Sequence, residues 1–398
     1  MNRLSNICKI LLFLIILFLF LCLCKNFKNK YENFDNNQTN QNSENNFLTF
    51  YRCKDKMLGK IIKDIFDTNN IKQTDDNWNI YVPCGYNNVE NELKTIDIKN
   101  NNSNSDKYIF GVNGCDTIVS KNKIWECLVK CYGREKARTL MPESYILDDP
   151  NEMMEFRRHF NPNEKAIYIL KKNVQRKEGL KLTRDFFEIL NGSDEDYRVA
   201  QKYITDLYLI NDRKINLRIY LLIIVKNNTV YFYLCRKGKC IYTNKKYNDN
   251  DLDFESNITS YNLDMTVYKN NPRNFDELRK YIDNNVYNRP NAGAYVFKKI
   301  DAIMTKVSKC LANNIYQSKN IKGSVTFQLF GCDVIFTDDL LPYLLEMNKG
   351  PDMTPRDEID EEMKSTVQID MFRTIGILDK DSEKLEKRKN SFYSIFSN

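Results

Sequence analysis

Histidine is almost absent from this sequence: the only one among 398 residues is His159. Catalytic mechanisms that use several histidines, and zinc sites rich in histidine, are therefore excluded. The residue lies in the charged run 155–159 (EFRRH), which favours a surface position on a helix. No internal repeat is visible either.

CxxC pairs are also absent, although the chain has twelve cysteines. Three of them belong to the first 25 residues, and the other nine are scattered through apolar runs. The closest spacings run from Cys127 to Cys131 and from Cys235 to Cys240. An odd number without paired spacing predicts reduced, buried thiols rather than a disulfide framework.

Charge of one sign is only mildly in excess, with 60 basic and 53 acidic residues giving a net charge of +7. Such a bias would favour an acidic partner or an anionic surface, but a coding bias toward Lys and Asn would produce it too. The apolar fraction of 42% and the aromatic fraction of 12% indicate a globular protein. The length suffices for two or three packed subdomains.

The one long apolar run, Ile10 to Cys24, has fifteen residues. It is shorter than the roughly 20 residues of a membrane-spanning helix, but flanking residues and snorkelling lysines can extend it. A signal peptide is the alternative, yet no small-x-small cleavage site follows. We therefore expect a membrane anchor at residues 1–25, formed by a single transmembrane helix, and a flexible tether at residues 26–46, which are rich in Asn, Gln and Lys.

The globular pattern begins at Phe47, and we expect subdomains at residues 47–119, 120–204 and 205–398. Ser120 is a plausible N-cap of a helix whose apolar residues follow at helical spacing. Lys121 then lies at the positive end of the helix dipole. This position indicates an anionic partner, although an exposed lysine is the commoner alternative.

Two later segments combine strands with basic residues. Residues 166–171 (AIYILK) predict a strand that leads into a basic loop containing Gly179. This loop either covers a bound phosphate group or is an ordinary turn. Residues 213–235 predict a hairpin in which Lys214, Asn216 and Arg218 share one face. Two cations on one strand face repel each other unless an anionic group lies between them.

Another hairpin is predicted from Val325 to Pro351, with a polar turn at residues 337–342. If this turn is symmetric, Asp333 lies opposite Glu346, and Asn348 shares the face of Glu346. Two carboxylates and one amide suit Mg²⁺. The alternative is a set of polar strand ends that face solvent.

Taken together, six motifs in order resemble those of the tubulin-tyrosine ligase family, including its glutamylating and glycylating relatives. The resemblance covers roughly residues 111–378 and rests on YILKK, RKEGL, VAQKYI, RKINLRIY, NITSYNL and FGCDVIFTDDLLPYLLEMN. It implies an α/β (α+β) ATP-grasp fold, in which two subdomains clamp ATP between sheets. The implied reaction is carboxylate–amine ligation through an acyl phosphate.

The resemblance also implies roles for eleven residues. The implied Mg²⁺ ligands are Asp333, Glu346 and Asn348; the implied phosphate-binding residues are Lys121, Lys171, Lys214 and Arg218; the implied adenine contacts are Gln201, Lys202 and Tyr203. Asn216 joins the implied ATP-binding set, and Arg218, Lys214 and Glu346 are the implied catalytic residues. Phosphoryl transfer of this kind needs positioning and charge neutralisation more than a protein nucleophile.

Four positions depart from the family pattern. Asn216 replaces an aspartate, Ile241 a basic residue, Lys177 the glycine that opens the phosphate loop, and Ser260 an asparagine. Losing one charge-stabilising contact typically costs about 10²- to 10³-fold in rate, by analogy with oxyanion holes. Either a nearby lysine, 237 or 239, substitutes for the lost cation, or the acceptor chemistry has changed, or activity is lost.

Three functions remain open on these grounds. The first is an ATP- and Mg²⁺-dependent ligase that adds free Tyr, Glu or Gly to tubulin or another acidic protein. It would be anchored to a membrane, with the globular part facing the cytosol, where ATP and tubulin are found. The second is a catalytically impaired pseudoenzyme that binds tubulin or another protein from the membrane. The third, a nucleic-acid binder, has only the net charge in its favour, so no nucleic-acid partner is expected.

Overall fold

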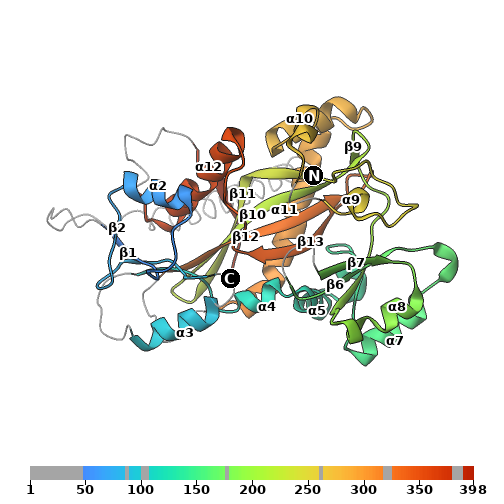
Figure 1. The fold of residues 1–398 in the computed structure, drawn as a ribbon, viewed down its shortest axis with the longest axis horizontal. Helices are drawn as coiled ribbons and strands as arrows, with labels where there is room; N and C mark the ends of the chain where they lie inside the picture. Colours follow the sequence, from blue (N-terminus) through green and yellow to red (C-terminus); the bar gives the residue numbers. More distant parts are fainter. Residues whose placement is uncertain are drawn as a thin grey trace, which may run out of the picture. The chain divides into compact units, whose positions relative to one another are not determined.

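Two β-sheets and the helices around them make up the described part of the chain (Figure 1). The computed structural model describes residues 48–85, 89–99, 107–174, 179–259, 263–316, 325–378 and 389–398. All of these residues belong to one compact unit, Leu48–Asn398.

The larger sheet has ten strands and contains both the first and the last strand of the described chain. The spatial order is β14-β11-β10-β12-β4-β3-β1-β2, with β13 added to β12 and β9 added to β10. Parallel pairing links β12 to β4 and the strands beyond it, whereas β9 to β14 pair antiparallel. The strands are β1 (Thr49–Tyr51), β2 (Lys72–Gln73), β3 (Ile80–Tyr81), β4 (Tyr108–Phe110), β9 (Leu209–Ile210), β10 (Arg213–Lys226), β11 (Thr229–Tyr242), β12 (Val325–Phe336), β13 (Pro342–Lys349) and β14 (Phe392–Ser397).

Both faces of this sheet are buried, because apolar side chains on β10 point alternately to either side. Ile219 and Leu221 pack with α4, α5, α10 and α11, whereas Tyr220 and Leu222 pack with α2 and α12. Burying each such side chain contributes roughly 1.5–3 kcal/mol. The helices are α2 (Lys60–Thr68), α3 (Val89–Lys99), α4 (Cys115–Val119), α5 (Lys121–Tyr132), α6 (Arg134–Ala137), α9 (Phe254–Asn257), α10 (Phe275–Asn285), α11 (Ala292–Leu311) and α12 (Glu358–Ile375), with 3-10 turns η5 (Met265–Lys269) and η6 (Ala312–Asn314).

The smaller sheet lies within residues 144–202 and is antiparallel, in the order β5-β8-β6-β7. Two helices pack on one of its faces, where Phe156 and Ile189 meet Tyr168 (Figure 1). The first helix begins at a favourable cap, since the Asp149 carboxylate accepts from two backbone N–H groups and proline follows. The elements are β5 (Ser144–Ile146), α7 (Pro150–His159), η2 (Pro162–Glu164), β6 (Tyr168–Lys171), β7 (Leu180–Thr183), α8 (Phe186–Leu190), η4 (Gly192–Glu195) and β8 (Val199–Lys202).

The register of the β12–β13 hairpin places Asp333 directly opposite Glu346, as the sequence predicted. The symmetric six-residue turn behind that prediction is not what the structure has. Strand β12 ends at Phe336 and β13 begins at Pro342, so the turn has five residues. A bulge at Leu345 absorbs the difference of one residue and restores the predicted pairing beyond it.

The prediction that the cysteines are all reduced is wrong. Disulfides join Cys53 to Cys84 and Cys131 to Cys310. The partners are 31 and 179 residues apart in sequence, so no spacing motif could announce them. The five free thiols are Cys115, Cys127, Cys235, Cys240 and Cys332 within the described residues.

The expected transmembrane helix is also corrected. Within residues 48–398, no helix that the structure describes is both long enough and apolar enough to cross a bilayer. The expected span, Ile10 to Cys24, and the tether at 26–46 lie outside the described residues. Of the predicted fold class, the mixed α/β part therefore stands, and the transmembrane helix and the membrane-anchored location are withdrawn. The subdomain boundaries at 119/120 and 204/205 stay a prediction.

Candidate active site

A cavity of about 960 Å³ draws its lining from both sheets. Strands β6, β7 and β8 of the smaller sheet contribute one part, and β10, β12 and β13 of the larger sheet contribute another. All eleven residues for which the sequence implied a role line this cavity: Lys121, Lys171, Gln201, Lys202, Tyr203, Lys214, Asn216, Arg218, Asp333, Glu346 and Asn348. Their convergence from five separate segments is the main structural finding about the site.

The β12–β13 hairpin supplies the acidic end of the cavity. Arg218, on the neighbouring strand β10, donates from Nε to Asp333 Oδ1 (2.6 Å) and from Nη2 to Oδ2 (3.2 Å). Asn348 donates from Nδ2 to Glu346 Oε1 (2.9 Å). The register of β10 with β12 explains the first contact, since Arg218 pairs with Asp333. The second contact joins residues two apart on β13, which share one face of that strand.

The two opposed carboxylates have different electrostatic surroundings. Burial raises the pKa of Asp333, and Glu346 adds to the rise while Arg218 opposes it. Burial alone would also raise the pKa of Glu346, but the ammonium groups of Lys171 and Lys121 outweigh it and hold that pKa below its usual range. Glu346 therefore stays ionised between the lysines and the aspartate.

Three lysines enter the cavity without a carboxylate in ion-pair contact among the described residues. Lys171 donates to Gln201 Oε1 (2.7 Å), and Lys214 donates to Tyr203 Oη and the Asn257 carbonyl oxygen (3.0 Å each). Lys121 donates to the carbonyl oxygens of residues 172 and 174. Burial, the largest cause, lowers the pKa of Lys171 to about 8 and that of Lys214 to about 7, and it also lowers the pKa of Lys121.

The segment predicted to contact adenine is held firmly in the smaller sheet. Gln201 uses both ends of its amide, since it accepts from Lys171 and donates from Nε2 to Ser144 Oγ (3.0 Å). The Tyr203 hydroxyl donates to the Asn257 carbonyl oxygen (2.8 Å), whereas Lys202 is largely exposed. The Gln201 side chain thus already orients a lysine, and its predicted adenine contact stays a prediction.

Comparison with known proteins identifies the family to which this chain belongs. The tubulin-tyrosine ligase family model matches residues 98–384, which is most of the chain. This chain belongs to the tubulin-tyrosine ligase family.

Relatives in the family are similar at low identity. "Probable tubulin polyglutamylase TTLL9" of Rattus norvegicus is 27% identical over 201 residues, covering 49% of this chain and 41% of that protein. "Tubulin polyglutamylase TTLL7" of Xenopus tropicalis is 23% identical over 288 residues, covering 66% of this chain and 30% of that protein. The chain thus spans about two fifths or less of the length of these curated relatives.

Two of the departures from the family pattern face each other in the structure. Asn216 on β10 pairs directly with Ile241 on β11, and both line the cavity. By the pattern that the resemblance implies, one acidic and one basic position would both be replaced by uncharged residues on adjacent strands, with no change in local net charge. The other two departures, Lys177 and Ser260, lie outside the described residues.

The two lysines considered as substitutes for the missing cation lie in different places. Lys239 pairs across the strands with Arg218, two residues from Ile241, and its ammonium contacts Asp360 (3.0 Å). Lys237 contacts Asp276 (2.7 Å) and lines a different pocket. Lys239 is therefore the nearer substitute, although it is held by a carboxylate and does not line the cavity itself.

Sequence analysis missed three groups that shape the site. Ser144 orients Gln201, the Asn257 carbonyl oxygen accepts from Lys214, and the Leu345 carbonyl oxygen lies 3.5 Å from Lys171 Nζ. Two of them act through backbone carbonyls, which every residue has, so side-chain type gives no signal. Ser144 could have been noticed only through its cross-strand pairing with Gln201.

The side chains present fit the magnesium and nucleotide that the family implies. Two opposed carboxylates and an amide provide the oxygen donors that Mg²⁺ prefers. Asn216 also lines the cavity, and its Oδ1 is buried and accepts no hydrogen bond from the described residues. Buried lysines with lowered pKa, and without a carboxylate contact, match a polyanion such as a triphosphate.

Proposed function

We propose that this protein is an ATP- and Mg²⁺-dependent carboxylate–amine ligase that adds an amino acid to tubulin or another acidic protein. One observation carries the proposal: the acidic hairpin and the buried lysines, from separate segments, line one cavity. The curated relatives are named tubulin polyglutamylases. We therefore propose glutamate as the added residue, ahead of tyrosine and glycine.

The acidic and the basic residues of the cavity would have different roles in this reaction. When bound, Mg·ATP would supply the phosphoryl group that activates the acceptor carboxylate toward the incoming amine. Asp333, Glu346 and Asn348 would hold the magnesium, with Arg218 keeping Asp333 in position. Lys171 and Lys214 would neutralise phosphate charge, and both are pre-placed by hydrogen bonds. Preorganised charges stabilise developing charge more effectively than charges that must be reoriented in water.

The test is amino-acid transfer by the full chain. The protein is mixed with tubulin, Mg·ATP and labelled Glu, Tyr or Gly, and label in tubulin is measured. Glu346→Gln should lower the rate at least about 10²-fold, since it removes a charge that acts on the reacting phosphates. Glu135→Gln, an exposed position on α6, is the matched control and should leave the rate unchanged. Transfer that survives Glu346→Gln contradicts the assigned role of the hairpin.

A pseudoenzyme is the second candidate, favoured by the paired change at Asn216 and Ile241. It would keep nucleotide binding for stability and bind an acidic protein without modifying it. ATP binding by calorimetry, with no label transfer to tubulin for any of the three amino acids, would favour this candidate. Absence of ATP binding would contradict both.

A further inference from the structure

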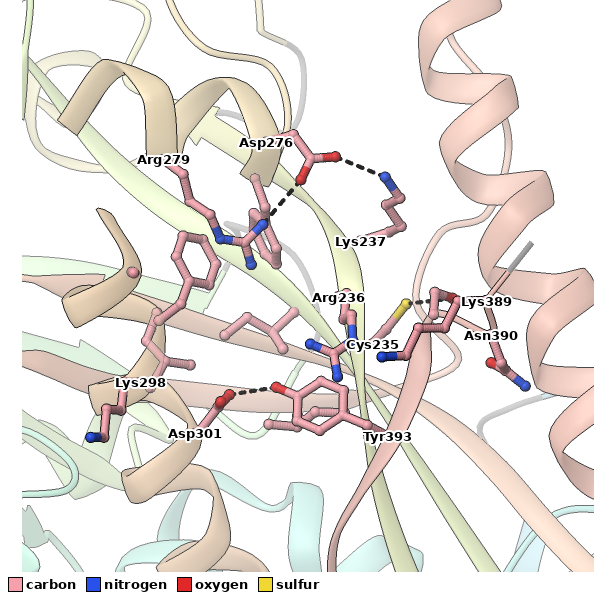
Figure 2. A pocket seen from close by; sticks show the side chains of 17 residues that line it. Cys235, Arg236, Lys237, Asp276, Arg279, Lys298, Asp301, Lys389, Asn390 and Tyr393 are labelled. Atoms are coloured by element: carbon pink, nitrogen blue, oxygen red, sulfur yellow. Dashed lines mark hydrogen bonds and ion pairs between the residues drawn. The ribbon is translucent and has the colours of Figure 1, made fainter. Parts of the chain in front are cut away.

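A second pocket, of about 430 Å³, lies on the other face of the larger sheet. Its floor includes Ile219 of β10, whose side chain points away from the face that carries Arg218. Strand β11, helices α10 and α11, and residues 389–393 form the rest (Figure 2). The volume is within the range of about 300–1,000 Å³ that small-ligand sites occupy. No residue of the proposed ligase site belongs to it.

Cations outnumber anions in this pocket by five to two. The two carboxylates are already engaged: Asp276 contacts Lys237 (2.7 Å) and Arg279 (3.0 Å), and Asp301 accepts from the Tyr393 hydroxyl (2.5 Å). The remaining cations, which have no carboxylate in ion-pair contact among the described residues, are Arg236, Lys298 and Lys389. The pocket therefore carries a surplus of positive charge.

Aromatic rings hold the two guanidinium groups in place. Arg236 lies over Tyr393 at 4.3 Å from the ring centre, and Arg279 lies over Phe297 at 3.9 Å. Stacking restricts a guanidinium before any ligand arrives, so less entropy is lost when its planar fork binds a carboxylate. In Figure 2 the charged ends of Arg236 and Lys389 point into the same part of the pocket.

We propose that this pocket binds an acidic peptide segment through its side-chain carboxylates. Arg236 and Lys389 share one part of the pocket, whereas the Lys298 ammonium lies apart from them on α11 (Figure 2). Two separated regions of positive charge suit carboxylates spaced along a chain better than one compact phosphate. The apolar floor, with Phe275 and Ile300, suits the methylene stems of glutamate. This binding goes beyond the proposed function and needs neither ATP nor Mg²⁺.

The test is binding of a fluorescent decaglutamate peptide to the full chain, followed by anisotropy without nucleotide. Arg236→Gln combined with Lys389→Gln should weaken binding about tenfold or more, as expected for charges that contact the partner directly. Lys72→Gln combined with Lys136→Gln removes the same charge at exposed positions elsewhere and should change affinity less than about twofold. Asp301→Asn, which can still accept from Tyr393, should tighten binding.

Several outcomes would overturn the proposal. Equal weakening in the two double variants would mean diffuse attraction, and no weakening in the pocket variant would mean that the peptide does not bind there. Loss of binding in Lys171→Met would place the peptide in the other cavity. Displacement of the peptide by inorganic phosphate, beyond the effect of chloride at equal ionic strength, would mean that the pocket recognises phosphate. Failure of tubulin modification alone would leave this inference standing.

Discussion

The two ends of the large cavity differ in whether they carry the charged residues that the resemblance implies. At the hairpin end both carboxylates are present and accept hydrogen bonds, Asp333 from the Arg218 guanidinium and Glu346 from the Asn348 amide. At the other end, where β10 meets β11, the facing pair Asn216 and Ile241 carries no charge. The predicted magnesium-binding end thus keeps the residue types that the resemblance implies, while two of the four departures form one cross-strand pair at the other end. We infer that the change alters what is bound beside the nucleotide more than the nucleotide itself.

The largest expected effect follows from removing the ion pair between Arg218 and Asp333 at the hairpin end. Arg218→Met leaves the Asp333 carboxylate beside Glu346 without its guanidinium partner, and the two side chains of the ion pair are only 20% and 13% exposed. Because the pair is partly screened, we expect a loss of about 2–4 kcal/mol in the free energy of unfolding, at or below the range for fully buried pairs. Urea denaturation measures it. Replacing both residues, by Arg218→Met with Asp333→Leu, should recover most of the loss. An Arg218→Met variant as stable as the unchanged protein would mean that the pair contributes no stability.

The next effect is a pH dependence of ATP affinity. The folded pKa values of about 7 for Lys214 and about 8 for Lys171 lie far below the ordinary value of 10.5. A bound polyanion raises both, so above pH 7 binding must take up protons. Affinity should be flat below pH 7 and fall by up to about tenfold per pH unit per lysine above it. Calorimetry in buffers of different ionisation enthalpy measures this uptake.

Lys214→Met is the control for the pH dependence. It should remove the decline that begins near pH 7 and leave the one that begins near pH 8. An unchanged profile would show that Lys214 does not meet the nucleotide.

The smallest expected effect concerns the other end of the cavity, where Asn216 pairs with Ile241. Ile241→Arg alone adds an unpaired charge at a partly buried position, and Asn216→Asp alone adds one of opposite sign at a buried position, so each should destabilise the fold. Together they should recover, with a coupling of about 0.5–3 kcal/mol in a double-mutant cycle followed by denaturation. Additive losses would show that the two positions do not act as a pair.

Much of this architecture could be predicted from sequence because its elements carry local signals. The apolar runs of β10 and β12 predicted these strands, and period-two alternation placed Lys214 and Arg218 on one face of β10. The pairing of Asp333 with Glu346 was predicted correctly, but partly by compensation, since a shorter turn and the bulge at Leu345 cancel. Bulges depend on how side chains pack after the strands meet, so the pattern alone does not predict them.

Other features could not be predicted because they depend on contacts between distant segments. The Cys131–Cys310 disulfide links helices 179 residues apart. The Asn257 carbonyl oxygen that fixes Lys214 belongs to a segment whose backbone position follows from the tertiary fold. The pocket behind the sheet could not be predicted because its cations come from four segments, none of which is unusual by itself.

The parallel pairing of β4 with β12 has a consequence for biosynthesis. Phe110 pairs with Phe327, so 217 residues of chain separate partners in the middle of the sheet. Strands β1 to β4 leave the ribosome first, but they cannot take their places until β12 has been synthesised. Closing so long a loop makes the contact order high, and such topologies fold slowly. The earliest strands of this protein are therefore among the last to become native, and during translation their unpaired edges are surfaces for a chaperone to protect.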